Sequence, residues 1–143
     1  MGSDDLSEVL TIERSVNVSP WGRISFEESL TREHDCRVVM FDKTLIAYHL
    51  VCAVADELHI LNLGVSKPYQ GKGIGHVLMQ DILDVECSKT KKVARLFLEV
   101  RASNYVAQNL YQQWQFKQIS LRKAYYRTHQ AEREDALIFM REF

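Results

Sequence analysis

Three glycines in five residues, Gly71, Gly73 and Gly75, separate an apolar segment from an amphipathic one. The apolar segment at 58–65 predicts a strand, and residues 76–87 predict a helix. Glycine lets backbone N–H groups approach a ligand closely, and a helix start adds unpaired N–H groups and a positive dipole end. A strand, a glycine turn and a helix start in this order predict a pyrophosphate site, and therefore a phosphorylated cofactor.

The glycine turn has to be distinguished from other phosphate-binding patterns. A Walker A run, G-x-x-x-x-G-K-[ST], does not occur in the chain. A dinucleotide-binding turn needs G-x-G-x-x-G after the first strand of a parallel sheet, whereas the preceding strands here read as hairpins. The glycines alone also leave open a flexible turn before an ordinary helix. A third pattern, Q-x-x-G-x-G after an apolar strand, is met by Gln70, Gly73 and Gly75.

Composition limits the class of protein. The 143 residues are 46% hydrophobic and 26% charged, which predicts one globular domain at 1–143. A net charge of −1 gives no basic footprint for nucleic acid. No apolar run approaches the roughly 18 residues of a membrane span, and the acidic start differs from a secretory signal. We therefore expect a cytoplasmic protein without a direct nucleic-acid or membrane partner.

Cysteine and histidine usage predicts neither disulfides nor a metal. Cys36, Cys52 and Cys87 form no C-x-x-C pair and read as reduced thiols. The five histidines follow no metal-ligand spacing. No metal site is expected.

Apolar periodicity and turn residues predict a mixed α/β fold, with helices covering both faces of one sheet. The predicted elements are helices at 6–16 and 24–32, strands at 37–41, 44–55 and 58–65, a helix at 72–87, a strand at 95–100, a helix at 105–114, and strands at 116–126 and 136–143.

Two helices carry details that the structure can test. The first opens on the capping-box spacing Asp5-Leu6-Ser7-Glu8, and its inward stripe has one polar member, Glu13. The helices at 72–87 and 105–114 each show one apolar stripe. The stripe residues are Ile74, Val77, Leu78, Ile82 and Val85 in the former, and Val106, Leu110 and Trp114 in the latter.

The Q-x-x-G-x-G pattern and the order of elements resemble the coenzyme A-binding acetyltransferases of the GNAT superfamily. Three further segments are similar to its RimI-type group, the ribosomal-protein-alanine N-acetyltransferases. These segments are L-E-V-R-A-S-N at 98–104, A-x-x-L-Y at 107–111, and Tyr125-Tyr126 followed by Glu134-Asp135-Ala136. The resemblance implies the GNAT fold, a twisted and mostly antiparallel sheet with helices on both faces. Since only four residues precede the capping box, its N-terminal edge strand should be short or missing.

The resemblance implies acetyl transfer from acetyl-CoA to the N-terminal alanine of a small-subunit ribosomal protein, by direct attack in a ternary complex. The partner would be that peptide, and the enzyme a monomer or weak dimer. An α-amino group titrates near pH 8, so one modest base suffices. Two alternatives stay open: an acetyltransferase for another amine, such as a lysine side chain or a small metabolite, and an acyl-CoA-binding module without turnover.

Glu99 and Tyr111 are the implied base and acid. A carboxylate within the strand at 95–100 is costly to bury without a partner, and partial desolvation would raise its pKa. The alternative for Glu99 is solvent exposure or an ion pair with Arg101. Tyr111 would protonate the leaving sulfur if Leu110 filled the core in its place. Its alternative is an ordinary core aromatic.

The remaining implied site residues surround the cofactor and the substrate. The backbone of Leu63, Gly64 and Val65 would pair with the pantetheine arm as an added strand does, and Gly64 suits a bulge or a close approach. Asn104 would bind pantetheine or cap the next helix. The residues implied to bind pyrophosphate are Gln70, Gly71, Lys72, Gly73, Ile74, Gly75 and His76. The substrate-groove positions, alternatively core aromatics, are Trp21, Tyr125 and Tyr126.

Gln115 stands where the resembled family usually carries glycine after a helix. A helix commonly ends on a left-handed residue at this place. We expect Gln115 to adopt that conformation at a cost of about 1 kcal/mol.

Overall fold

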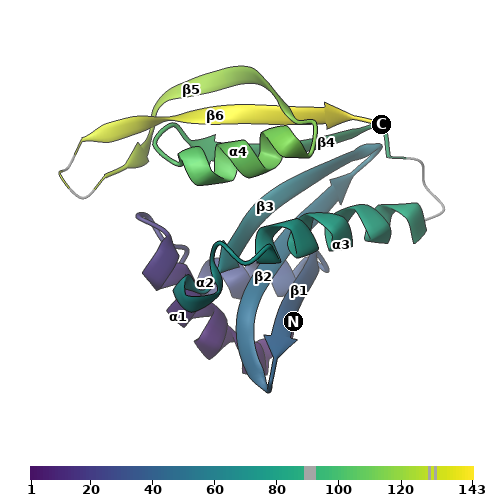
Figure 1. Ribbon diagram of the computed structural model, residues 1–143, viewed down its shortest axis with the longest axis vertical. Coiled ribbons are helices and arrows are strands. Elements are labelled where there is room, and N and C mark those ends of the chain that lie inside the picture. Colours follow the sequence, from purple (N-terminus) through teal and green to yellow (C-terminus); the bar gives the residue numbers. More distant parts are fainter. Residues whose placement is uncertain (89–92, 129, 131) are drawn as a thin grey trace.

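The computed structural model describes residues 1–88, 93–128, 130 and 132–143. It shows one six-stranded sheet with helices on both faces (Figure 1). The elements are the 3₁₀ turn η1 (Ser3–Asp5), α1 (Leu6–Val16), α2 (Arg23–Thr31), β1 (Asp35–Phe41), β2 (Thr44–Val54), β3 (Glu57–Val65), the 3₁₀ turn η2 (Lys67–Tyr69), α3 (Ile74–Ser88), β4 (Arg95–Arg101), α4 (Tyr105–Gln113), β5 (Lys117–Arg127) and β6 (Arg133–Glu142).

The sheet has the strand order β1-β2-β3-β4-β6-β5. Neighbouring strands are antiparallel except β3 and β4, which run parallel and are connected through α3. The predicted mixed α/β class and mostly antiparallel sheet are confirmed. In the part of the chain that the structure describes, η1 is the first element and no strand precedes α1.

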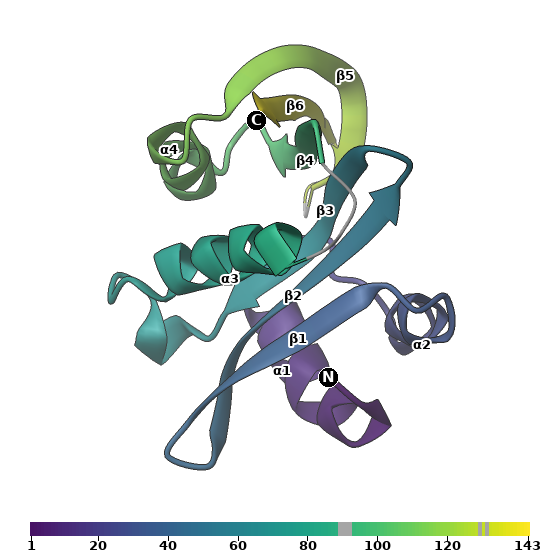
Figure 2. The same ribbon diagram turned by 90° about the vertical axis from the view of Figure 1, so that its right-hand side faces the viewer.

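The sheet opens in its middle. β3 and β4 pair only over residues 57–60 and 95–98. On its other side, β3 pairs Ile60 with Val51 and Asn62 with Leu50, which leaves Leu61 as an extra residue. Such a bulge bends a strand and increases its twist. Beyond Leu61 the two halves of the sheet diverge, as Figures 1 and 2 show.

Hydrophobic cores on both faces hold the helices on the sheet. α1 and α2 pack on one face, where Leu10 and Phe26 meet Tyr48 of β2. α3 and α4 pack on the other face, where Met79 and Tyr111 join a core that includes residues of β2, β3, β4 and β6. The helices therefore cover both faces, and the core under α3 and α4 spans both halves of the sheet.

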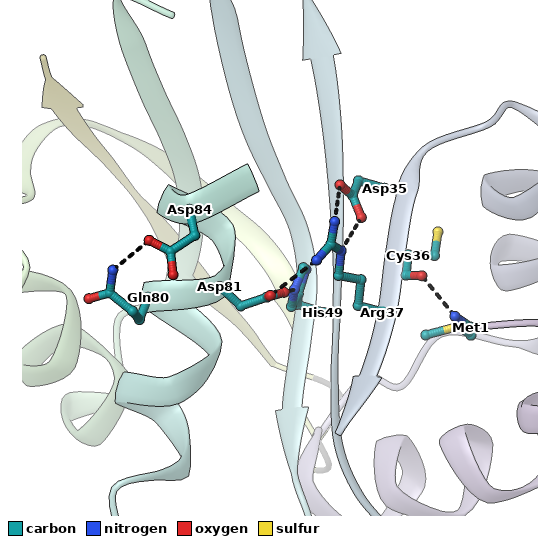
Figure 3. A network of polar contacts seen from close by, with 8 residues as sticks. All are labelled: Met1, Asp35, Cys36, Arg37, His49, Gln80, Asp81 and Asp84. Carbon is teal, nitrogen blue, oxygen red and sulfur yellow. Dashed lines mark hydrogen bonds and ion pairs between the residues drawn. The ribbon is translucent and has the colours of Figure 1, made fainter. Parts of the chain in front are cut away.

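Polar contacts fix α3 to the first two strands (Figure 3). Asp81 of α3 contacts His49 Nε2 of β2 at 2.7 Å and Arg37 Nη1 of β1 at 3.1 Å. Arg37 also pairs with Asp35 at 2.9 Å. His49 is 1% exposed, and its Nδ1 has no hydrogen-bond partner among the described residues. Burial lowers the pKa of His49 and outweighs the opposing effect of the Asp81 carboxylate.

Some local predictions about α3 and α4 are wrong. α3 begins at Ile74, not residue 72, because Gly71 and Gly73 have φ of +70° and +82°, outside the helical region. Val77 is half exposed, and the neighbouring Met79 is buried instead. In α4, Val106 is exposed on the solvent side. The residues of α4 that pack on the core are Ala107, Leu110, Tyr111 and Trp114.

α1 begins at Leu6 as predicted, but its predicted cap and the predicted start of β6 need correction. The Asp5 carboxylate accepts a hydrogen bond from Gly2 N–H at 2.7 Å and makes no capping bond to α1, so the predicted capping box is wrong. The turn η1 occupies its place. β6 begins at Arg133, three residues before the predicted start at residue 136. Hydrogen bonds with Arg101 and with the Ala124 N–H hold Glu134 and Asp135 in the strand.

The prediction for Gln115 is confirmed, since its φ is +67°. The N–H groups of Gln115 and Phe116 donate to the carbonyls of Gln112 and Tyr111, each at 3.0 Å. This is a Schellman ending, and the Tyr111 and Phe116 rings supply its usual apolar contact at 5.8 Å. The helix end therefore holds Gln115 in a conformation that a side chain disfavours.

Cys36 and Cys52 are free thiols. The side chain of Cys87 lies outside the described part of the chain. Within the described residues, no helix is long and apolar enough to cross a membrane.

Candidate functional site

A cleft lies between the separated ends of β3 and β4. Its lining comes from both halves of the sheet, from the end of α1 and the segment after it, and from α4. Glu99 of β4 and Tyr111 of α4, the predicted base and acid, both line it. The lining also includes Glu13, Asn17, Ser19, Trp21, Asn62, Leu63, Arg101, Asn104 and Tyr126.

Glu99 is partly exposed, and its carboxylate pairs with Arg122 of β5. The Glu99 Oε1 to Arg122 Nη1 distance is 3.3 Å, and 31% of the Glu99 side chain is exposed. The alternative pairing with Arg101 is wrong, because Arg101 binds Glu134 instead. Glu99 therefore faces the cleft next to a cation that holds its side chain in place.

Tyr111 belongs to the core and also reaches the cleft. It is 5% exposed and packs against the rings of Phe116 and Phe139 at 5.8 and 6.4 Å. The expectation that Leu110 fills the core in its place is wrong, because both side chains pack inward. Burial raises the pKa of Tyr111, and the nearby Tyr126 adds to the effect. The phenol therefore stays protonated at neutral pH, as a proton donor must.

Tyr126 lines the cleft together with the two predicted catalytic residues and is held by Arg101. The guanidinium carbon of Arg101 lies 4.3 Å from the Tyr126 ring centroid. The same guanidinium donates to Glu134 at 2.8 Å and to the Arg127 carbonyl at 3.0 Å. Burial and the charge of Glu99 raise the pKa of Tyr126 to about 12.

The Glu134-Asp135 pair fixes the part of β5 that leads to Tyr126. Asp135 accepts a hydrogen bond from Ala124 N–H at 2.9 Å, and Ala124 has a φ of +51°. The β5–β6 register shifts between Arg122 and Tyr126, so Ala124 lies within an irregular stretch. Such irregularities redirect side chains. The acidic pair thus fixes the stretch that carries Tyr126.

A groove adjoins the cleft on the face of the sheet that carries Trp21. It encloses about 450 Å³ and shares Glu99, Trp21 and Tyr126 with the cleft. Tyr125 lines it as well, so the three predicted substrate-groove residues gather at one place. We call it the acceptor groove. Its further lining includes His59, Phe97, Arg122 and Ile138.

The glycine turn lies beside the free end of β3. The Gln70 side chain donates from Nε2 to the Val65 carbonyl at 2.9 Å. A Cβ at Gly71 or Gly73 would meet nothing within 4 Å, so the space in front of this backbone is open. The first N–H groups of α3, at Ile74 and Gly75, have no partner within the helix. The turn thus suits the pyrophosphate that the sequence predicts.

Two glycines serve packing in addition to any ligand contact. A Cβ at Gly75 would lie 3.0 Å from Leu110 Cδ2, so Gly75 lets α3 approach α4. A Cβ at Gly64 would lie 2.7 Å from the Tyr48 ring. The bulge in β3 is at Leu61, which corrects the suggestion that Gly64 marks it. Gly64 is instead the position at which the β3 backbone closely approaches the Tyr48 ring.

The other predicted cofactor residues have partners within the protein. His76 Nδ1 accepts a hydrogen bond from Trp114 Nε1 at 2.9 Å, which ties it to the end of α4. Lys72 Nζ lies 5.6 Å from the Tyr69 ring centroid. Asn104 Oδ1 accepts from Ala107 N–H at 3.1 Å. Asn104 therefore caps α4 and lines the cleft, as both of its interpretations required.

Sequence reasoning missed the buried carboxylate of Glu13 and its partner Asn62. Glu13 is 1% exposed and lines the cleft. Its only signal was a polar residue within an apolar helical stripe. The structure contains no group of three or more His, Cys, Asp or Glu residues suited to a metal ion among the residues it describes.

A family model described as "Acetyltransferase (GNAT) family" matches residues 5–116. The chain belongs to the GNAT acetyltransferase family. It is an acyltransferase, and its co-substrate is acetyl-CoA. The open backbone of the glycine turn and the unpaired edge of β3 suit that co-substrate.

Relatives within the GNAT family share the whole architecture. A ribosomal protein bS18-alanine N-acetyltransferase of Escherichia coli K12 is 33% identical, over 94% of this chain and 88% of its own length. One from Salmonella typhimurium is 30% identical, over 96% and 91%. The crystal structure of the E. coli ribosomal-protein-S18-alanine N-acetyltransferase superposes with a TM-score of 0.89 at 30% identity, covering 99% of this chain and 90% of that one.

Proposed function

We propose that this GNAT enzyme acetylates the α-amino group of the N-terminal alanine of ribosomal protein bS18. Two relatives at 30% and 33% identity carry that activity in their names. The observation that carries the proposal is that two spaces share their walls. Glu99, Trp21 and Tyr126 line both the acceptor groove and the cleft that holds Tyr111.

The proposed reaction needs one proton acceptor and one proton donor. Acetyl-CoA supplies a thioester carbonyl, with its diphosphate at the glycine turn and its pantetheine arm along residues 63–65 of β3. Glu99 accepts a proton from the incoming ammonium, directly or through a water, and the neutral nitrogen forms a bond to the carbonyl carbon. The carbon–sulfur bond breaks as Tyr111 donates its proton to the departing sulfur. The nitrogen loses its second proton as the amide forms, and that proton returns to the Tyr111 phenolate through a water.

An α-amino group suits this site better than a lysine side chain. Its ordinary pKa is near 8, against about 10.4 for lysine, so far less free energy is needed to deprotonate it at neutral pH. Among the residues that the structure describes, Glu99 is the one carboxylate that lines both the cleft and the acceptor groove. One such base suffices for an N-terminal substrate.

Mass spectrometry of peptides incubated with the enzyme and acetyl-CoA tests the proposal. The panel holds the N-terminal peptide of bS18, the same peptide with its α-amino group blocked and a lysine retained, and a peptide with a different first residue. Acetylation of the free alanine peptide alone is expected. Modification of the blocked peptide at lysine would assign the enzyme to another amine, and no modification of any peptide would contradict the proposed peptide substrate.

The same proposal covers the organisation of the protein. One sheet carries both the cofactor turn and the acceptor groove, so we propose that residues 1–143 act as a single domain. We further propose a monomer or weak dimer, with the ribosomal peptide as partner and the cytoplasm as the place of reaction.

A further inference from the structure

Glu13 is a buried carboxylate that accepts four hydrogen bonds. The donors are Asn17 Nδ2, Trp21 N–H at 2.8 Å, the Tyr48 hydroxyl, and Asn62 Nδ2 at 3.1 Å. They come from the end of α1, the α1–α2 connection, β2 and β3. A buried carboxylate needs such compensation. Four donors from separate segments make Glu13 a point at which these segments meet.

The connection at 17–22 depends on this residue. Asn17 N–H donates to the Glu13 carbonyl at 2.9 Å, and the Asn17 side chain and Trp21 N–H donate to its carboxylate. Apart from the turn bond from Ser25 N–H to the Gly22 carbonyl, the described residues show no other hydrogen bond from this connection. Glu13 is therefore its one polar anchor.

The connection also forms a wall of the reaction site. Asn17, Ser19 and Trp21 line the cleft, and Trp21 lines the acceptor groove as well. The opposite wall, β3, has one hydrogen bond with Glu13, from Asn62, and is otherwise held by its pairing with β2 over residues 57–65 apart from Leu61. Loss of the Glu13 contacts should therefore release the acceptor side and leave the co-substrate side in place.

We propose that Glu13 is a positioning residue for the acceptor: its carboxylate fixes the 17–22 connection, and with it Trp21, against the cleft. The inference rests on the proposed function, in which Trp21 borders the peptide. The Glu13 carboxylate is engaged by donors within the protein, so Glu13 acts through the connection. The amide in Glu13→Gln has nearly the same shape, but its NH₂ group would face donors, so the connection would lose contacts without creating a cavity.

Steady-state kinetics with the bS18 peptide test the proposal. Since a hydrogen bond to a charged group contributes about 1.5–3 kcal/mol, Glu13→Gln should raise the peptide KM about tenfold or more. The KM for acetyl-CoA should stay within about twofold. Val9→Ala is the matched control, because Val9 is fully buried on the same helix in the same core and lines neither space. At a comparable loss of melting temperature it should leave both constants unchanged.

Acrylamide quenching of Trp21 fluorescence, in a Trp114→Phe background, provides a measurement that needs no turnover. Quenching should increase in Glu13→Gln and remain at the parent value in Val9→Ala. Equal quenching in the two variants, or an equal rise in the KM of both substrates, would overturn the role of Glu13. A parent enzyme that acetylates no peptide would instead remove the proposed function, and the quenching result would still decide whether Glu13 holds the connection.

Discussion

Tyr48 lies directly across β2 and β3 from Gly64, so close that a Cβ at position 64 would come within 2.7 Å of the Tyr48 ring. The Tyr48 hydroxyl donates to Glu13, and burial, with the charge of Glu13, raises its pKa far above the ordinary value. The absence of a side chain at position 64 therefore allows Tyr48 to reach the buried carboxylate.

Gly64→Ala should destabilise the protein by about 1–3 kcal/mol, because the added methyl group forces Tyr48 out of its place. Urea unfolding measures the loss. Gly22 is a matched control position, since a Cβ there would meet nothing within 4 Å. Equal stability of Gly64→Ala and the parent would show that Tyr48 can move at no cost.

Glu99→Gln should lower the rate of acetyl transfer chiefly at low pH. Above the α-amino pKa of about 8 the substrate is already neutral, so the contribution of the base shrinks as the pH rises. Initial rates from pH 6 to about 9.5 check this, with coenzyme A affinity from calorimetry as the control that should not change. A rate profile identical to that of the parent would remove Glu99 from the mechanism.

Tyr111→Phe should reduce kcat by a factor of about 10²–10⁴, the range in which general acids contribute. The ring that packs on Phe116 and Phe139 is retained, so the melting temperature should change little. Single-turnover rates distinguish loss of chemistry from slow product release. A rate near that of the parent would leave Tyr111 a packing residue only.

Gln115→Gly should stabilise the protein by about 1 kcal/mol, because glycine adopts the observed φ of +67° without steric cost. The control is Gln112→Gly, three residues earlier within α4, which should destabilise by about 1 kcal/mol. Chemical denaturation of both variants gives the comparison. Destabilisation by both substitutions would mean that the Gln115 side chain makes a contribution larger than its backbone strain.

His49 should make stability depend on pH in the mildly acidic range. Its folded pKa lies below the ordinary 6.5, so between these values the unfolded chain binds more protons than the folded one. The His49 contribution is therefore complete above pH 6.5 and is lost as the pH falls through 6.5 toward the folded pKa. Protonation would also bury an Nδ1–H group without a partner, since Nδ1 is buried and unpaired among the described residues.

His49→Leu tests this dependence. Although the variant loses the contact with Asp81, its free energy of unfolding should fall less steeply than that of the parent from pH 7 to about 5. Urea titrations at several pH values measure both slopes. Parallel curves would assign the acid sensitivity to other groups.

The sequence predicted what depends on local patterns. Periodicity located every helix and strand, and the left-handed Gln115 followed from its place after a helix. The predictions that failed depended on partners distant in sequence. Val77 and Met79 are apolar residues two positions apart in α3, and only packing decides which of them faces the core. Glu134 and Asp135 were predicted as loop residues, and their hydrogen bonds with Arg101 and with the Ala124 N–H hold them in a strand.

The site residues were predicted from the family resemblance. The residues that hold them in position were not predicted. Glu99, Tyr111 and the groove aromatics line two spaces that share residues, although no local pattern gave their proximity. Arg122 and Asn62 carried no signal, because each acts through one contact with a residue far along the chain. Glu13 stood out as a polar residue on an apolar stripe, but its role required knowledge of its four donors.

The short pairing between β3 and β4 gives the co-substrate a structural part to play. Strand pairing joins the two halves of the sheet over residues 57–60 and 95–98 only. A pantetheine arm lying along the rest of β3 would pair with the part of that strand that β4 leaves unpaired, and it would hold the two halves of the sheet in position. The chemistry and the rigidity of the protein would then depend on one molecule. Each release of coenzyme A would make the two halves of the sheet less rigid relative to each other until the next acetyl-CoA binds.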